Sequence, residues 1–254
     1  MKEKNIDIQF DHIIHYINGI EDFRFPGNKL NIIPGGKHLS LGTKNSLSRI
    51  DLSYIEFIDV FDKQLIEAAM KDDKEYLSFA STLGRTNYTE GFKRLCFRTH
   101  DIYALNHHFK SLGLKTLGPL KMERVTPQGK LIQWELLYID DERNFELPFF
   151  IQWGESDKER QKVLESEMQL HLHIDTIVIE THDFDSIAEI FVSWLDYEVI
   201  GGVINTYFLL KKEGLPHIKL VPGNENKIRR LEIKTQDDSL KGEHLVHDAV
   251  YAFI

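Results

Sequence analysis

Residues 95–113, LCFRTHDIYALNHHFKSLG, place an apolar run directly before a helical pattern. The first four residues are typical of a buried strand, and from Ile102 to Leu112 apolar side chains recur at spacings of three and four, as on one face of a helix. Thr99-His100-Asp101 stands between the two patterns, where Thr or Asp can accept hydrogen bonds from the first helical turn. Gly113 follows where a left-handed residue commonly ends a helix. The stretch predicts a strand that runs straight into a capped helix.

The same order recurs later in the chain. Residues 174–180 read as a strand, Thr181-His182-Asp183 repeats the triplet, and residues 184–195 carry helical spacing. Further strands are expected after each helix, over 115–125, 130–139 and 149–153 in one case and over 206–211, 217–221 and 229–234 in the other. The turn Pro127-Gln128-Gly129 separates the first two as in a hairpin. A strand, a helix and three strands form a βαβββ unit.

The N-terminal part fits the same unit with a degenerate helix. A strand is predicted over residues 8–17, and residues 18–31 are too short and too rich in Gly and Pro for a good helix. Pro34-Gly35-Gly36 predicts a turn, and strands are expected within 47–52 and 54–60. Residues 61–80 have the pattern of one helix.

These units predict an α+β fold in which repeated βαβββ modules form a curved mixed sheet around a cleft, with helices outside. Residues 6–153 are expected to hold two paired modules. The charged stretch 154–169 predicts a solvent-facing helix at a boundary. Residues 170–254 would then hold a third βαβββ-like module and a C-terminal tail. That module would either extend the sheet or pair with another subunit, as in a homodimer.

Composition narrows the classes of partner. The chain has 254 residues, 42% hydrophobic, with a formal net charge of -9, which disfavours nucleic acid and anionic membranes because both repel an acidic surface. The single cysteine, Cys96, excludes an intrachain disulfide and reads as a buried structural thiol. There is neither an apolar leader core nor a membrane-length apolar run. A cytoplasmic protein is expected.

Four motifs in order resemble one known family. They are Phe10-Asp11-His12-Ile13-Ile14, then Gly35-Gly36-Lys37-His38 with Gly42-Thr43-Lys44-Asn45-Ser46-Leu47, then Tyr54-Ile55-Glu56-Phe57-Ile58, and finally Leu147-Pro148-Phe149-Phe150-Ile151-Gln152-Trp153. Together they resemble the glyoxalase-like domain family of the vicinal oxygen chelate (glyoxalase/bleomycin resistance/dioxygenase) superfamily. Each motif alone is weak, but their order across residues 8–153 is specific.

The resemblance implies a divalent metal, Zn, Fe, Ni or Mn, held by His and Glu side chains in a cleft. Carried over by position, His12 and Glu56 are the implied metal ligands, and Glu56 is also the implied catalytic group. Alternation along the strands places His12 on one face of its strand and Glu56 on one face of another. An imidazole and a carboxylate among apolar neighbours need a partner. That partner can be a metal, a substrate or each other.

The second module departs from the family pattern. Alignment of the opening strands places Lys93 opposite His12, and alignment of the closing strands places Gln152 opposite Glu56. A neutral amide oxygen binds a divalent ion more weakly than a carboxylate does. Gln152 is therefore assigned to substrate binding.

The Gly-rich segment of the first module supplies the remaining candidates for substrate binding. They are His38, expected in a loop, with Thr43 and Asn45. Loops on a rigid scaffold often carry binding groups. The alternative is that Thr43 and Asn45 only shape a turn.

Three functions remain open from the sequence. The first is a glyoxalase-like small-molecule enzyme of lyase or isomerase type, in which a bound metal acts as a Lewis acid. The second is a metal-free protein that binds or sequesters a small molecule, of bleomycin-resistance type. The third is a protein–protein module whose pocket has decayed.

Overall fold

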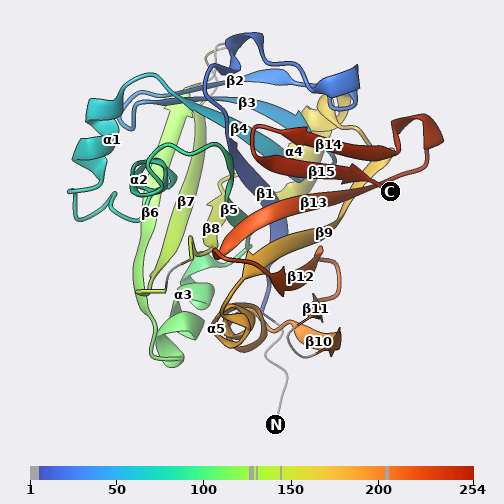
Figure 1. The fold of residues 1–254 in the computed structure, drawn as a ribbon. Coiled ribbons are helices and arrows are strands. Elements are labelled where there is room, and N and C mark those ends of the chain that lie inside the picture. The colour runs from blue at the N-terminus through green and yellow to red at the C-terminus, as the bar shows by residue number, and fades with distance from the viewer. Residues whose placement is uncertain (1–5, 126–128, 130, 144, 204–205) are drawn as a thin grey trace.

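The computed structural model describes residues 6–125, 129, 131–143, 145–203 and 206–254. Two curled mixed sheets pack against each other (Figure 1). The first has eight strands in the order β2-β3-β4-β1-β5-β8-β7-β6. Its strands are β1 Gln9–Tyr16, β2 Ile33–His38, β3 Thr43–Arg49, β4 Tyr54–Val60, β5 Gly91–Arg98, β6 Lys115–Val125, β7 Leu131–Asp140 and β8 Phe149–Trp153. The predicted turn at Pro127-Gln128-Gly129 falls largely outside the described residues.

Two modules of the same topology form this sheet. β1 runs parallel to β4 and β5 runs parallel to β8, while β1 and β5 lie side by side and antiparallel. The α+β fold of repeated βαβββ units is thus confirmed. In the first module two short 3₁₀ turns, Ile20–Asp22 and Pro26–Asn28, replace the helix. Gly19 and Gly27 adopt positive φ there, so a regular helix cannot form.

Both Thr-His-Asp triplets mark a junction between a strand and a helix, as predicted. Asp101 caps α3 (Ile102–Ser111) by accepting a hydrogen bond from Ala104 N, and Asp183 caps α5 (Phe184–Glu189) by accepting one from Ser186 N. In each triplet the Thr hydroxyl also accepts from the backbone N–H of the Asp. α5 continues into a π-helical turn, Ile190–Trp194.

The C-terminal part forms a second, seven-stranded sheet in the order β10-β11-β12-β9-β13-β15-β14. Its strands are β9 Leu172–Thr181, β10 Glu198–Val203, β11 Tyr207–Lys211, β12 His217–Pro222, β13 Lys227–Thr235, β14 Gly242–Val246 and β15 Ala249–Phe253. The third module consists of β9, α5 and β10 to β12. The sequence pattern does not predict β10. It also places residues 229–234 in the third module, whereas they lie in β13, outside that module. β13 instead pairs antiparallel with β9 and parallel with β15, as β5 does with β1 and β8.

The residues expected to be a tail therefore complete a shortened fourth unit. The third module neither extends the first sheet nor needs another subunit to cover β9, because β13 of the same chain pairs with it. The sequence pattern was ambiguous because this unit has no helix between β13 and β14, only the 3₁₀ turn Asp238–Leu240.

The segment between β4 and β5 also differs from its prediction. Residues 61–80 form no single helix; α1 (Lys63–Ala69) and α2 (Phe79–Arg85) are separate and pack on each other. Asp62 and Ser78 each cap the N-terminus of one helix, so the segment has two helix starts rather than one. The predicted turn at Pro34-Gly35-Gly36 lies within β2, where residues 35 and 36 form an irregularity in the pairing with β3.

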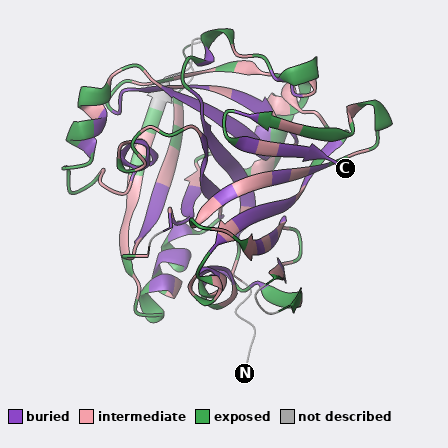
Figure 2. Cartoon of the chain, in the orientation of Figure 1, coloured by how far each residue is buried: buried purple, intermediate pink, exposed green. Residues whose placement is uncertain are grey.

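The central strands of the first sheet are mostly buried (Figure 2), and two separate apolar clusters distinguish the two faces of this sheet. One face packs on α3 and the second sheet in a large core. The other carries a separate apolar cluster that joins β1, β4, β5, β7 and β8 to α1 and α2. The His12 ring contacts Phe149 of this second cluster, so we name this side the His12 face. Among the described residues, no helix is both long and apolar enough to cross a bilayer.

Candidate functional site

His12 and Glu56 lie next to each other on the His12 face. His12 is in β1 and Glu56 is in the neighbouring parallel strand β4, where Glu56 pairs with Ile14. His12 Nε2 is 3.4 Å from Glu56 Oε2, and both residues are buried. The His12 ring stacks on Tyr54 and meets the edge of Phe149. The expected proximity of the two side chains is confirmed, while their roles stay a prediction.

Asp11 determines the orientation of the imidazole. The pairing of β1 with β5 shifts register between Phe10 and His12, and this bulge frees Asp11 from the regular alternation of the strand. Asp11 Oδ1 lies 2.7 Å from His12 Nδ1. Burial opposes ionisation of Asp11, but the hydrogen bond with His12 and the charge of Arg160 lower its pKa to about 2. An ionised carboxylate can only accept, so the proton resides on His12 Nδ1.

A second group of contacts holds Asp11 from the other side. Trp153 Nε1 donates to Asp11 Oδ2 at 2.9 Å, and Arg160 Nη2 lies 3.6 Å from the same oxygen. Arg160 belongs to α4 (Asp157–Leu164), and its guanidinium stacks 4.4 Å from the centre of the Trp153 ring. The expected solvent-facing helix thus directs one buried arginine into the site.

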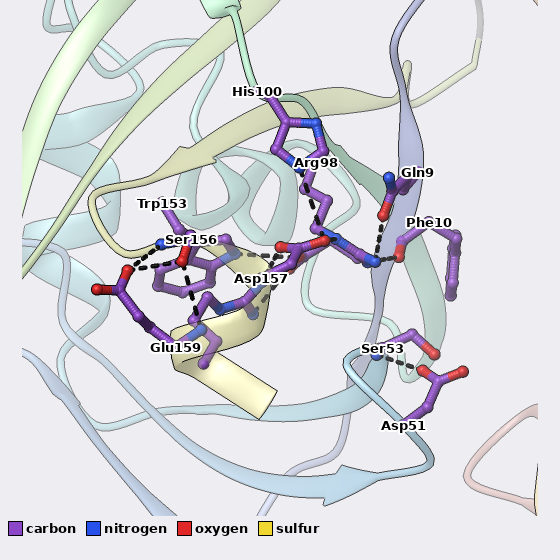
Figure 3. A network of polar contacts seen from close by, with 12 residues as sticks. Gln9, Phe10, Asp51, Ser53, Arg98, His100, Trp153, Ser156, Asp157 and Glu159 are labelled. Carbon is purple, nitrogen blue, oxygen red and sulfur yellow. Dashed lines mark hydrogen bonds and ion pairs between the residues drawn. The ribbon is translucent and has the colours of Figure 1, made fainter. Parts of the chain in front are cut away.

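α4 is fixed by its own polar contacts (Figure 3). Ser156 and Glu159 form a capping box at its N-terminus. Asp157 accepts a hydrogen bond from Arg98 Nε at 2.9 Å, and Arg98 also donates to Phe10 O and to Gln9 Oε1. These bonds connect α4 to the N-terminal end of β1, next to Asp11.

Asn45 of β3 holds the other end of the pair. Its Nδ2 donates to Glu56 Oε1 at 2.5 Å, and its Oδ1 accepts from Gly36 N at 2.6 Å. A Cβ on Gly35 would lie 2.1 Å from Asn45 Oδ1, so this close approach requires glycine. The Gly35-Gly36 pair therefore forms an irregularity in β2 that leaves room for the side-chain amide of Asn45.

His38 and Thr43 contact each other. His38 lies at the end of β2, not in a loop, and its Nδ1 is 3.0 Å from Thr43 Oγ1. The His38 ring also meets the edge of Phe79 from α2.

Gln152 has a structural contact of its own. Its Oε1 accepts a hydrogen bond from Ile102 N at the start of α3. Gln152 also lines an open pocket of about 600 Å³ with Met122, Trp134 and Trp153. Because Trp153 donates to Asp11, one wall of this pocket belongs to the site.

The strand registers correct the expected counterparts in the second module. β1 pairs with β4 through His12 and Tyr54, and β5 pairs with β8 through Cys96 and Phe149. His12 and Cys96 are also direct partners across β1 and β5. Cys96, not Lys93, therefore corresponds to His12, and Ile151, not Gln152, corresponds to Glu56. The alignment made from the sequence is therefore displaced by three residues in β5 and by one residue in β8.

Comparison with known proteins agrees with this geometry. A family model described as a glyoxalase-like domain matches residues 10–195. The chain belongs to this glyoxalase-like domain family. The crystal structure of a hypothetical protein from Staphylococcus aureus superimposes on this glyoxalase-like chain with a TM-score of 0.93, and it covers 97% of this chain and 99% of that one. The two sequences are 30% identical. No curated protein matches.

Two distant structures share the fold of this glyoxalase-like protein. The Mn(II)-bound glyoxalase from Novosphingobium aromaticivorans is 10% identical, with a TM-score of 0.54 over 97% of this chain and 81% of that one. A mutant of 4-hydroxymandelate synthase from Streptomyces coelicolor is 11% identical, with a TM-score of 0.55 over 91% of this chain and 72% of that one. At these identities the likeness shows the fold alone.

The first module of the glyoxalase-like chain has donors that fit one divalent ion. A separation of 3.4 Å between His12 Nε2 and Glu56 Oε2 suits two ligands at about 2.0–2.2 Å from the same ion. From the second module, Cys96 has its sulfur within 4.8 Å of ligand atoms of Asp11 and His12. Burial, and then the charges of Asp11 and Glu56, raise the pKa of the Cys96 thiol well above its usual range. Cys96 thus remains a neutral thiol, which is a weak ligand.

Sequence reasoning missed Asp11 and Arg160. Asp11 is part of the motif that pointed to His12, but regular alternation would direct its side chain to the opposite face. Only the bulge overturns that rule. Arg160 lies in a charged segment in which nothing distinguishes it from its solvent-facing neighbours.

Proposed function

We propose that this protein is a glyoxalase-like enzyme of lyase or isomerase type, in which His12 and Glu56 hold a divalent ion (Zn, Fe, Ni or Mn) beside a small-molecule substrate. One observation carries the proposal. Asp11 keeps the proton on His12 Nδ1, so the lone pair of Nε2 faces the carboxylate oxygen of Glu56 at 3.4 Å. Two buried acceptors repel each other unless a cation or a proton lies between them.

The surrounding residues support this assignment. Asp11 is a carboxylate partner of the kind that orients metal-bound histidines and raises their basicity. Asn45 occupies Glu56 Oε1 and leaves Oε2 for the ion or for a proton. An ion bound here would act as a Lewis acid on adjacent substrate oxygens. Glu56 is the proposed catalytic group, because its carboxylate can accept a proton in a water-poor site.

The substrate contacts are part of the same proposal. His38, Thr43 and Asn45 border the His12 face, and Gln152 lines the pocket next to Trp153. The partner is a small molecule, and assembly into a homodimer stays a prediction that sedimentation velocity can check.

Replacement of Glu56 tests the metal. In the parent protein, chelator should lower the midpoint of thermal unfolding, and excess Zn²⁺, Mn²⁺, Fe²⁺ or Ni²⁺ should raise it, because a ligand of the native state stabilises that state. Glu56→Gln should abolish this response and lower the metal content measured after tag-free purification. The variant keeps the shape of the side chain and one hydrogen-bonding oxygen. Its stability without metal should fall by only about 1–3 kcal/mol.

Glu146→Gln is the matched control. Glu146 is a half-buried carboxylate that accepts hydrogen bonds from Thr82 and Arg85. This control should lose stability yet keep the full response to metal. Absence of a metal response in the parent would contradict the enzyme proposal.

A metal-free binding protein is the second candidate, favoured by the second module. Cys96 and Ile151 occupy the positions that correspond to His12 and Glu56, so the site has two strong ligands rather than four. In this case a proton would lie between His12 and Glu56. A small molecule would then raise the midpoint of thermal unfolding even with chelator present. Glu56→Gln would lower the free energy of unfolding by the same amount with and without metal.

A further inference from the structure

Lys93 occupies a pocket that lies apart from the His12 face. It belongs to β5, where Lys93 and Arg94 together oppose a single residue of β1, because the register shifts between Ile13 and His15. Such a bulge redirects side chains. Arg94 lies over the rings of Tyr138 and Phe149, which belong to the His12 face. Lys93 instead lines a pocket of about 460 Å³ at the junction of the two sheets.

The amine of Lys93 has little compensation for burial. The residue is 8% exposed, and its Nζ donates to Thr89 Oγ1 at 3.0 Å. Among the described residues, that neutral hydroxyl is the one hydrogen-bond partner of Nζ. Burial lowers the pKa of Lys93 to about 8, although the charges of Glu146 and Asp248 oppose the shift. A desolvated ammonium with one neutral partner releases its proton more readily than an exposed one.

The charges around the pocket argue against an anionic ligand. Four carboxylates and one further amine line it with Lys93, namely Glu90, Glu146, Glu225, Asp248 and Lys227. Each carboxylate already has a basic partner, since Glu146 binds Arg85, Asp248 binds Arg229, Glu225 binds Lys227 and Glu90 binds His247. Among the described residues Lys93 has no such partner, and the four carboxylates against two amines in the lining leave no surplus positive charge to attract a phosphate or a carboxylate. A small neutral electrophile fits this lining best.

We propose that Lys93 is a nucleophilic amine that forms an imine with small neutral aldehydes or ketones in this pocket. The neutral amine nitrogen attacks the carbonyl carbon, a C–N bond forms, and the carbonyl electron pair moves to oxygen. Proton transfer from nitrogen to oxygen gives a carbinolamine. The carbinolamine hydroxyl then takes up a proton from bulk water, its C–O bond breaks, water leaves, and the protonated imine remains. No oxidant or reductant takes part. This is the way in which desolvated lysines act as nucleophiles.

Competitive labelling tests the proposal on the intact protein. The protein would be exposed briefly to a limiting amount of propionaldehyde with cyanoborohydride, which traps the imine as a stable alkylamine. Peptide mass spectrometry would then give a labelling rate for each lysine between pH 6.5 and 10. At pH 7 about one-tenth of an amine with a pKa near 8 is neutral, against roughly 1 in 3,000 at a pKa near 10.5. The larger neutral fraction favours Lys93 about 300-fold at pH 7, but the lower basicity and the burial of its amine reduce this advantage. We therefore expect Lys93 to react about tenfold faster than the exposed Lys71, with a rate that levels off above pH 8.

Two variants sharpen the result. Lys93→Arg keeps the positive charge but forms no imine, so the fast-labelled site should disappear. Thr89→Val removes the hydroxyl that accepts from the ammonium, and the inflection in the rate of Lys93 should move to lower pH. Labelling of Lys93 only after denaturation would overturn the proposal. So would a rate that rises with pH as that of Lys71 does.

Discussion

At the scale of single residues, His15 shows how a buried ionisable group depends on both sheets. It lies in β1 on the face opposite His12 and is fully buried. Its Nδ1 is 2.7 Å from the hydroxyl of Tyr251 in β15, and its Nε2 is 3.3 Å from His247 O. A neutral imidazole with its proton on Nε2 satisfies both contacts, because it donates to the carbonyl and accepts from the hydroxyl. Burial lowers the pKa of His15 to about 3.

This shift predicts a loss of stability in acid. The unfolded chain takes up a proton on His15 below about pH 6.5, whereas the folded protein does so only near pH 3. The unfolded state is therefore favoured progressively as pH falls between these values. The contribution of His15 to the free energy of unfolding should fall by about 1.4 kcal/mol per pH unit. Urea unfolding of the parent and of His15→Phe between pH 7 and 4 would measure it. A parallel pH dependence in both proteins would contradict the prediction.

At the scale of elements, α4 links the two sheets and also completes the candidate site. Arg160 is 4% exposed, stacks on Trp153 and lies near the carboxylate of Asp11. The rest of the helix is polar and largely exposed, with its capping box in solvent. The position of Asp11, and through it that of the His12 ring, thus depends on a helix outside both βαβββ modules.

Removal of this guanidinium should be costly. Arg160→Met keeps much of the apolar contact but leaves the Asp11 carboxylate buried without its nearest cation. A broken buried ion pair typically costs about 3–5 kcal/mol, and we expect a loss of about 3 kcal/mol in urea unfolding at pH 7. Lys158→Met, on the exposed side of the same helix, should change stability by less than about 0.5 kcal/mol. Equal effects of the two changes would show that Arg160 does not stabilise the Asp11 carboxylate.

At the scale of the whole molecule, the two sheets share one core. Residues of β1, β4, β5 and α3 and residues of β9, α5, β13 and β15 belong to the same buried cluster. His15, Phe92 and Phe25 surround Tyr251 across the junction. Because each sheet buries apolar surface of the other, neither should persist once its partner unfolds.

The three tryptophans can test this cooperativity. Trp134 and Trp153 lie in the first sheet, and Trp194 lies in the turn that follows α5. Trp194→Phe would leave fluorescence that reports on the first sheet. Replacement of both Trp134 and Trp153 by Phe would leave the fluorescence of Trp194, which reports on the third module. Each variant should give coincident midpoints by fluorescence and circular dichroism in urea. A fluorescence transition separated from the circular dichroism transition would show that the sheets unfold independently.

The sequence by itself determined the repeated unit and the central pair of the candidate site. Local capping and hydrophobic periodicity specified the junctions at Asp101 and Asp183, and the motifs around His12 and Glu56 pointed to neighbouring side chains. Only the tertiary structure decided the rest. The bulges at Asp11 and Lys93 arise from pairing between β1 and β5, which are far apart in the chain. Arg160 reaches Asp11 only because α4 packs against Trp153. The place of β13 depended on a partner, β15, which a local pattern cannot identify because strand pairing is a contact over distance.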